Sequence, residues 1–464
     1  MKRIFLSILL IMLISVTALT LTGCDVLSQF FPSDSPQGGN IGGSDDKENI
    51  ENPEEPEGQT FVFTELEDGT YSIASTDYDS LPADLVIPSE YNGKPVTVIA
   101  EYGFNGAKIT RLTIPDSVHT IGWCAFTHCK NLVKLDLGDG VTSTGEHSFS
   151  NCEKLEDITY GNNLKVIGEF AFEECHSITE VIIPEGVVTV DGYAFYNCTS
   201  IKNIKISSSV ENIGYLAFAF TSNSLESIEV ADGNANYYVD SGCLIDRNWM
   251  MIILGHKNSV IPDDVRIIGS HAFFGCEGLT EIVIPASVTQ IFETTFTNCK
   301  NLESITVNEG NIWYRSENNC LIYIENKLVL GCKNSVIPAG IVSIENNAFF
   351  GCQDLSSIVI PESVTSIGDA AFYNCDGLTS IVIPDSVTYI GDDAFRACDN
   401  LENVVIGKGV QTIGNTVFYE SPKVTDIYYT GTEQEWKKIV IKNDMIDNNV
   451  LLNATKHYNY VPEE

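Results

Sequence analysis

Residues 378–400 read LTSIVIPDSVTYIGDDAFRACDN, and this stretch decides the fold of the 464-residue chain. Its phenylalanine, Phe395, is one of a series that recurs at nearly constant spacing. Most intervals are 23 residues, the first is 22, and two are longer, 55 and 53. Fixed self-similarity of this length predicts a solenoid in which each repeat is one coil. The series is Phe104, Phe126, Phe149, Phe172, Phe195, Phe218, Phe273, Phe296, Phe349, Phe372, Phe395 and Phe418.

The same stretch shows how one coil buries its apolar side chains. Ile381 and Ile383 are predicted to face inward from a short strand, while Val382 faces outward. Pro384 ends the strand because it has no N–H to donate to the ladder. A single coil leaves its apolar side exposed, so only a stack of coils is stable. The other residues predicted to point inward are Leu378, Val387, Ile390, Ala394, Phe395 and Cys398.

The repeat pattern LxxIxIPxxVxxIGxxAFxxC resembles the bacterial leucine-rich repeats of BspA-like surface proteins, over roughly residues 61–464. The resemblance implies a mainly β fold, namely a right-handed leucine-rich-repeat solenoid of 23-residue coils with short strands, two hairpin-like insertions and terminal caps. It also implies an extracellular protein that binds or adheres to proteins of a host or of neighbouring cells. The expected partner is therefore a protein ligand.

The N-terminus is predicted to be a targeting segment. The basic dipeptide at positions 2–3 precedes an apolar run over residues 4–21. Residues 21–24, LTGC, resemble the bacterial lipobox, which implies that Cys24 is acylated and becomes the mature N-terminus. A membrane-spanning anchor is the alternative, because the run is near the lower length limit for a membrane helix. We expect an extracytoplasmic protein, lipid-anchored to the bacterial cell membrane or cell surface.

Composition and the phenylalanine spacing together predict how the chain is divided into segments. Residues 24–60 are dominated by Gly, Pro, Ser and acidic residues with little to bury, which predicts a disordered tether. The two long phenylalanine intervals contain related sequences, GHKNSVIP and GCKNSVIP, that predict hairpins grown from a repeat. The expected divisions are 1–23 lipoprotein signal peptide, 24–60 acidic tether, 61–100 N-terminal cap, 101–421 repeat array with insertions near 222–262 and 302–338, and 422–464 C-terminal cap.

Nine of the 14 cysteines stand three residues after a repeat phenylalanine, and the repeats that lack one have Ala107, Thr221 or Ser421 there. This substitution pattern indicates a crowded inward position that requires a small side chain. One thiol per coil forms a row, whereas zinc requires four converging ligands, so no metal site is expected. Outside the row, Cys320 and Cys332 form a possible disulfide across the second insertion. The nine are Cys129, Cys152, Cys175, Cys198, Cys276, Cys299, Cys352, Cys375 and Cys398.

The net charge and the lack of catalytic motifs limit the classes of function that we expect. The chain has 26 basic and 63 acidic residues, a net charge of −37, which disfavours nucleic acid as a partner. No GxSxG, HExxH, P-loop or dinucleotide-binding glycine pattern occurs in a suitable setting. We therefore expect no catalytic residues, no cofactor and no enzyme activity. A structural spacer or envelope scaffold without a dedicated ligand is the alternative to a binding protein.

The second outward position of each strand forms a row that is polar early in the chain and largely valine later. An exposed apolar strip is a candidate contact site; the alternative is that valine simply suits any strand. Changing Val359, Val382 and Val405 together to Asp is expected to abolish binding and leave folding intact. The candidate binding strip consists of Ile182, Val283, Val359, Val382 and Val405.

Overall fold

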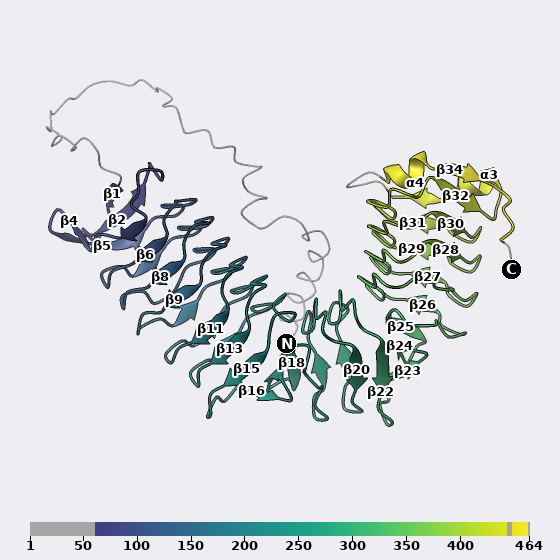
Figure 1. Ribbon diagram of the computed structural model, residues 1–464, viewed down its shortest axis with the longest axis horizontal. Helices are drawn as coiled ribbons and strands as arrows, with labels where there is room; N and C mark the ends of the chain where they lie inside the picture. The colour runs from purple at the N-terminus through teal and green to yellow at the C-terminus, as the bar shows by residue number, and fades with distance from the viewer. Residues whose placement is uncertain (1–60, 443–447, 463–464) are drawn as a thin grey trace, which may run out of the picture. The chain divides into compact units, whose positions relative to one another are not determined.

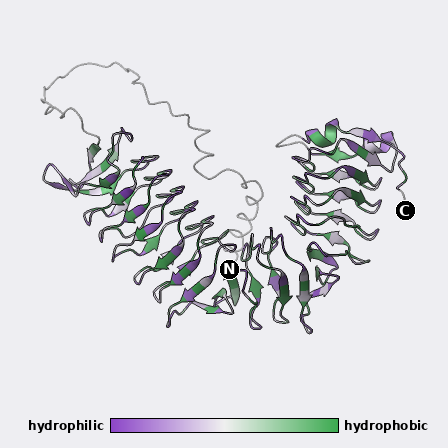
Figure 2. Ribbon diagram, in the orientation of Figure 1, coloured by the Kyte–Doolittle hydropathy of each residue, from purple (hydrophilic) through white to green (hydrophobic). Residues whose placement is uncertain are grey.

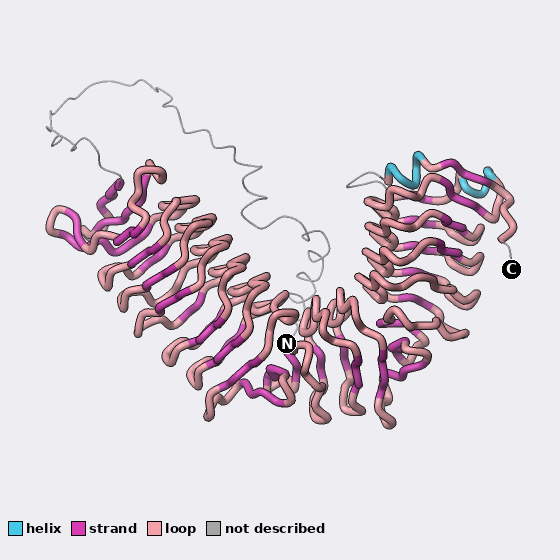
Figure 3. Tube along the Cα trace, in the orientation of Figure 1, coloured by secondary structure: helices cyan, strands magenta, loops and turns pink. Residues whose placement is uncertain are grey.

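The structure is a computed structural model that describes residues 61–442 and 448–462, all within the unit Gly58–Glu464. These residues form a mainly β solenoid whose coils stack side by side in chain order (Figure 1). Short strands stand at fixed places in coils that are otherwise loop and turn (Figure 3). The mainly β class and the 23-residue period are confirmed, since neighbouring coils pair with a shift of 23 residues. No helix in the described ranges is long and apolar enough to cross a membrane.

The predicted signal peptide at 1–23, the predicted lipid-bearing Cys24 and the predicted tether at 24–60 lie outside the described residues.

One face of the stack consists of the strands of the IxIP segments, and we call it the long-strand face. Its strands pair in parallel, as when Val181 lies opposite Ile204. The face is divided into four sheets, β3-β6-β8-β9, β11-β13-β15, β20-β22 and β28-β30-β32-β34. The strands are β3 Asp84–Val86, β6 Arg111–Thr113, β8 Lys134–Asp136, β9 Asp157–Thr159, β11 Glu180–Ile183, β13 Asn203–Ile206, β15 Ser227–Val230, β20 Glu281–Ile284, β22 Ser304–Val307, β28 Ser380–Ile383, β30 Asn403–Ile406, β32 Asp426–Tyr429 and β34 Thr455–His457.

The strands just before the bend glycines form a second face, the short-strand face. Most of these strands have two residues, and they also pair in parallel, as when Val190 lies opposite Ile213. From β25 to β33 this sheet is unbroken. The strands are β5 Lys94–Ile99, β7 Thr120–Ile121, β10 Val166–Ile167, β12 Thr189–Val190, β14 Asn212–Ile213, β19 Ile267–Ile268, β21 Gln290–Ile291, β26 Ser343–Ile344, β27 Ser366–Ile367, β29 Tyr389–Ile390, β31 Thr412–Ile413 and β33 Val440–Ile441.

The repeat phenylalanines form the centre of the core. Their rings stack face to face from coil to coil, for example Phe372 with its centroid 5.0 Å from that of Phe349 and 5.1 Å from that of Phe395. Every inward residue predicted for the coil 378–400 is buried. Apolar and polar residues accordingly alternate along the strands (Figure 2). The phenylalanine must therefore recur in every coil, because each ring is buried by the ring of the next coil.

Each insertion is a three-stranded antiparallel unit, one strand more than the predicted hairpin. The first contains β16 Tyr237–Asp240, β17 Cys243–Asp246 and β18 Met251–Leu254; the second contains β23 Tyr314–Glu317, β24 Cys320–Tyr323 and β25 Lys327–Leu330. The last strand of each unit pairs in parallel with the next coil, so the short-strand face resumes.

The phenylalanine stack is interrupted at both insertions, and a glycine takes the place of the missing ring. The N–H of Gly255 donates to the Ala272 carbonyl at 2.8 Å, as a repeat phenylalanine would. A Cβ on Gly255 would lie 2.2 Å from the ring of Phe273, and a Cβ on Gly331 would lie 2.0 Å from that of Phe349. The glycines of GHKNSVIP and GCKNSVIP are therefore required by close packing against the next ring.

The third side of the stack, from three residues before to two residues after each repeat phenylalanine, is called the turn edge. Its backbone N–H groups donate to the next coil, as from Phe195 to the Ala217 carbonyl at 2.8 Å. In most coils the residues two before and two after the phenylalanine adopt a left-handed conformation, as Tyr193 does at φ 57° and Asn197 at φ 56°. This tight path turns side chains such as Tyr193 toward the surface.

Both ends of the described array carry covering segments. At the N-terminal end, β1 Phe61–Glu65 pairs with β2 Tyr71–Ser75, β4 Glu90–Tyr91 pairs with β5, and the Phe61 ring contacts Phe104 at 6.3 Å. At the other end lie helices α3 Glu433–Trp436 and α4 Asn449–Asn453. The buried Asn448 amide accepts from the N–H of Val417 at 3.0 Å and donates to the Gly414 carbonyl at 2.8 Å. A side chain thereby replaces the backbone of a further coil.

Candidate binding surface

The structure places most of the candidate strip at the surface but buries one member. Val405 is 6% exposed, so its assignment to an outward strip was wrong. Its strand lies between those of Val382 and Tyr428, and the Tyr428 ring groups with His457 and Tyr460. Val405 is shorter than Tyr428, the residue opposite it, and the larger side chain covers it. The remaining members are exposed to 49% for Ile182, 36% for Val283, 78% for Val359 and 46% for Val382.

Two further valines belong to the same row and were missed. Val260 and Val336 occupy the outward position of NSVIP, the segment that corresponds to SIVIP in ordinary coils. Their side chains are 61% and 63% exposed. Aligning the two insertions on the IP dipeptide would have revealed them. Together with Val283, Val359 and Val382 they form what we call the valine row.

Three members of the valine row stand outside regular strands. The segment 357–360 was expected to form a strand, but it does not; Val260 and Val336 are also in loop segments. The segments of Val260 and Val336 follow the two insertions directly, and no strand of the long-strand face pairs with them or with 357–360. These breaks separate the sheets β11-β13-β15, β20-β22 and β28-β30-β32-β34.

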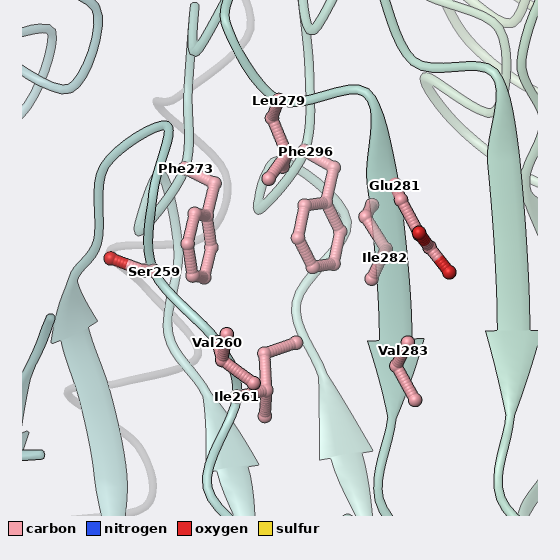
Figure 4. Close-up of a pocket in the computed structure, with 9 residues that line it drawn as sticks. All are labelled: Ser259, Val260, Ile261, Phe273, Leu279, Glu281, Ile282, Val283 and Phe296. Atoms are coloured by element: carbon pink, nitrogen blue, oxygen red, sulfur yellow. The ribbon is translucent and has the colours of Figure 1, made fainter. Parts of the chain in front are cut away.

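A cavity of about 210 Å³ opens at the first of these breaks, between Val260 and Val283 (Figure 4). The rings of Phe273 and Phe296 and the side chain of Ile282 line it. It forms because Ser259 stands where ordinary coils have an inward isoleucine. The hydroxyl of Ser259 donates to the Gly242 carbonyl at 2.8 Å, which holds the small side chain away from the opening. Glu281 and Ser259 add polar lining, and the cavity is large enough for one aliphatic or aromatic side chain against the two rings.

Earlier in the chain this row and the outward row beside it are polar or charged at most positions. Lys134 pairs with Asp157 at 2.9 Å and with Asp136 at 3.6 Å, and Lys205 pairs with Glu180 at 3.0 Å. These groups are solvated and already paired across coils. The apolar contact surface is therefore confined to the coils from Val260 onward, and Ile182 stands apart from it.

The cysteine row is buried throughout, as predicted. Each thiol of the regular coils donates to the carbonyl of a repeat phenylalanine, as Cys375 does to Phe349 at 3.2 Å. Ser421 donates to Phe395 in the same way at 2.9 Å, which explains why serine can replace cysteine there. Burial raises the pKa of Cys398 to about 12 and that of Cys375 further. At neutral pH these thiols are protonated and weakly nucleophilic.

Cys320 and Cys332 are free, buried thiols, so the structure does not contain the possible disulfide. Cys332 lies beyond the end of β25, and its sulfur is 3.9 Å from the Asn319 carbonyl, while that of Cys320 is 3.6 Å from the Val336 carbonyl. His256 takes the place of Cys332 in the first insertion, and burial lowers its pKa. Within residues 61–442 and 448–462, no three His, Cys, Asp or Glu side chains gather where they could hold a metal ion.

Comparison with protein families agrees with this geometry. Six copies of the BspA type leucine rich repeat region match residues 97–234, 254–325 and 323–446, well over half of the chain. The chain belongs to this repeat family. The resemblance inferred from the repeat pattern is thereby confirmed. No curated protein is similar enough to count as a match.

Several solved structures are similar to the chain. A leucine rich cell surface protein of Faecalibacterium prausnitzii is 26% identical, with 88% of this chain and 98% of that chain covered and a TM-score of 0.47. A leucine-rich repeat protein of Eubacterium ventriosum is 23% identical, with 73% and 92% covered and a TM-score of 0.47. The pneumococcal vaccine antigen PcpA is 15% identical, with 86% and 97% covered and a TM-score of 0.40.

Proposed function

We propose that this chain is an extracytoplasmic surface lipoprotein, anchored through Cys24, whose solenoid binds another protein through the valine row and catalyses nothing. The observation that carries the proposal is the exposure of Val260, Val336 and Val359 outside strands. The preference of valine for strands cannot account for these residues, because they are not in strands. Apolar side chains exposed in one row are typical of a protein contact surface.

The cavity beside Val283 adds a place for an anchoring side chain. Binding energy at protein interfaces is concentrated in a few side chains that fill desolvated pockets. Phe273, Phe296 and Ile282 supply apolar walls, and Val260 and Val283 form the rim. A partner segment that crosses the valine row would place one aliphatic or aromatic residue here. The lipid anchor rests on the lipobox at residues 21–24 and on the apolar run before it.

The test compares two triple variants of the immobilised protein. V336D/V359D/V382D places three carboxylates in the valine row, and T113D/T159D/I182D places three in the part of the same row that precedes Val260. Two panels are tested for binding to the wild type and to both variants. One contains matrix proteins of a host, and the other contains envelope proteins of the organism that produces this chain. We expect a captured protein to be lost from the first variant, by at least about a hundredfold in affinity, and kept by the second. Loss from both, or from neither, would contradict the proposed surface, and no capture at all would favour the spacer.

Val405 must be left unchanged in this experiment. A carboxylate at its buried position would be desolvated without a partner and is expected to destabilise the fold by about 3 kcal/mol. A triple change that includes Val405 would therefore confuse unfolding with loss of binding. Urea unfolding of V382D and V405D separates the two effects.

A further inference from the structure

Aromatic rings from successive coils contact one another along the turn edge, away from the valine row. The ring of His147 stacks on that of Phe170 with centroids 4.4 Å apart, and Phe170 stacks on Tyr193 at 4.5 Å. Tyr193 contacts Tyr196 at 5.4 Å and Tyr215 at 5.9 Å. We call these five residues the aromatic ladder. Tyr215, at its end, is 51% exposed.

Carboxylates accompany the aromatic ladder. Glu169 and Asp191 come from the coils of Phe170 and Tyr193, and neither forms an ion pair within the described residues. Gly192 lies beside both Glu169 and Tyr215, since a Cβ on this glycine would be 3.7 Å from Glu169 Oε1 and 3.3 Å from the Tyr215 carbonyl. Burial, together with the nearby charges of Glu146 and Asp191, raises the pKa of Glu169. The surface combines ring faces with negative charge that the buried His147 offsets in part and that no lysine or arginine of the described residues pairs with.

The C-terminal half of the turn edge shows what such a combination holds. There Arg396 places its guanidinium 5.6 Å from the ring centre of Tyr373 and 4.9 Å from that of Tyr419. It also pairs with Asp393 at 3.5 Å and with Glu420 at 3.2 Å. In these coils the chain supplies rings, carboxylates and the arginine. At the aromatic ladder it supplies the rings, the carboxylates and the buried His147, but no arginine.

We propose that the aromatic ladder is a second binding surface, which takes an arginine-bearing segment of a partner protein. A guanidinium would lie against the rings of Tyr193 and Tyr215 and pair with Glu169 and Asp191. Arginine fits better than lysine, because its planar group stacks on aromatic faces and pairs with carboxylates at the same time. The net charge of −37 draws a basic partner toward the whole chain, and the ladder supplies the local contacts. This surface is separate from the proposed function of the valine row.

The probe is a fluorescein-labelled peptide of alternating glycine and arginine with six arginines, and its lysine counterpart. Anisotropy titrations use the full chain at two salt concentrations. We expect the arginine peptide to bind at least about threefold tighter than the lysine peptide. Tyr215→Ala, and separately the double variant E169Q/D191N, should each weaken arginine binding by roughly fivefold to tenfold. Tyr215→Phe keeps the ring and should bind like the wild type.

Matched controls distinguish the site from general attraction to an acidic protein. D232N/D263N removes two exposed carboxylates elsewhere, and Trp249→Ala removes an exposed ring that is remote in sequence. Both should keep wild-type affinity within about twofold, as should the valine-row variant V336D/V359D/V382D. The proposal is overturned if the controls weaken binding as much as E169Q/D191N, if Tyr215→Ala has no effect, or if the two peptides bind equally. Loss of binding in the valine-row variant alone would assign the peptide to that other surface.

Discussion

The buried phenylalanine and cysteine rows and the outward row of the same coils differ in how strictly they repeat. Inside, a ring lies on a ring and a thiol or hydroxyl meets a phenylalanine carbonyl in coil after coil. Outside, the equivalent position runs from Asp136 through Lys205 to Val359. The interior must match its own neighbour, whereas the surface needs to match only a partner. Identical repeats therefore indicate structure, and departures from repetition on the surface indicate where recognition lies.

Raising the pH is expected to affect the interior most. Burial raises the pKa of Cys243, Cys276, Cys320 and Cys398 to about 12 in the folded chain, whereas an unfolded thiol has a pKa of about 8.5. The folded state keeps protons that the unfolded state loses, so this stabilisation is complete below about pH 8.5 and declines as the pH rises toward 12. In this pH range each such thiol lowers the free energy of unfolding by about 1.4 kcal/mol per pH unit.

Urea unfolding at pH 8 and at pH 10 checks this expectation. The urea concentration at the midpoint of unfolding should be much lower at pH 10 than at pH 8. Cys398→Ser removes one titrating thiol and should make the free energy of unfolding depend less steeply on pH. An unchanged midpoint, or rapid reaction of the native thiols with a disulfide reagent at pH 8, would show that the cysteine row is not protected. Changes in the valine row should leave the pH dependence as it is.

The second largest difference is expected between the truncation of an inward side chain and that of an outward one. Phe372→Ala removes a ring from the middle of the stack and should destabilise the fold by about 3–5 kcal/mol. Val382→Ala, in the next coil but exposed, should change stability by less than about 0.5 kcal/mol. Equilibrium unfolding measures both. Equal effects would mean that the outward row is part of the packing and not a free surface.

The smallest difference between two variants is expected within the cysteine row. Cys375→Ser should cost less than about 1 kcal/mol, because a hydroxyl can donate to the Phe349 carbonyl as Ser421 donates to that of Phe395. Cys375→Leu overfills the same site and should cost about 1–3 kcal/mol. Thermal unfolding ranks the two variants. If serine proves worse than leucine, size does not govern the position.

The spacing of the phenylalanines was enough to predict the solenoid and the inward residues of each coil, because both depend on a pattern that every coil repeats. Val405 could not be assigned correctly, since its burial depends on Tyr428 in the following coil. The missing strand at 357–360 could not be predicted either, because its sequence, SIVI, is identical to that of strand β28. Val260 and Val336 were within reach, because NSVIP and SIVIP share the IP dipeptide. The aromatic ladder left a weaker signal, a ring two residues before the phenylalanine in consecutive repeats.

Parallel pairing at a shift of 23 residues has a mechanical consequence. Each coil is held mainly by the coil on either side of it. A force that separates the two ends of the array is carried by every coil boundary, and the coils are released one at a time, starting where a neighbour is missing. Release of one coil adds about 75 Å of extended chain, since 23 residues reach about 3.3 Å each. The molecule can lengthen in steps under tension while the coils that remain stacked keep their surfaces in register.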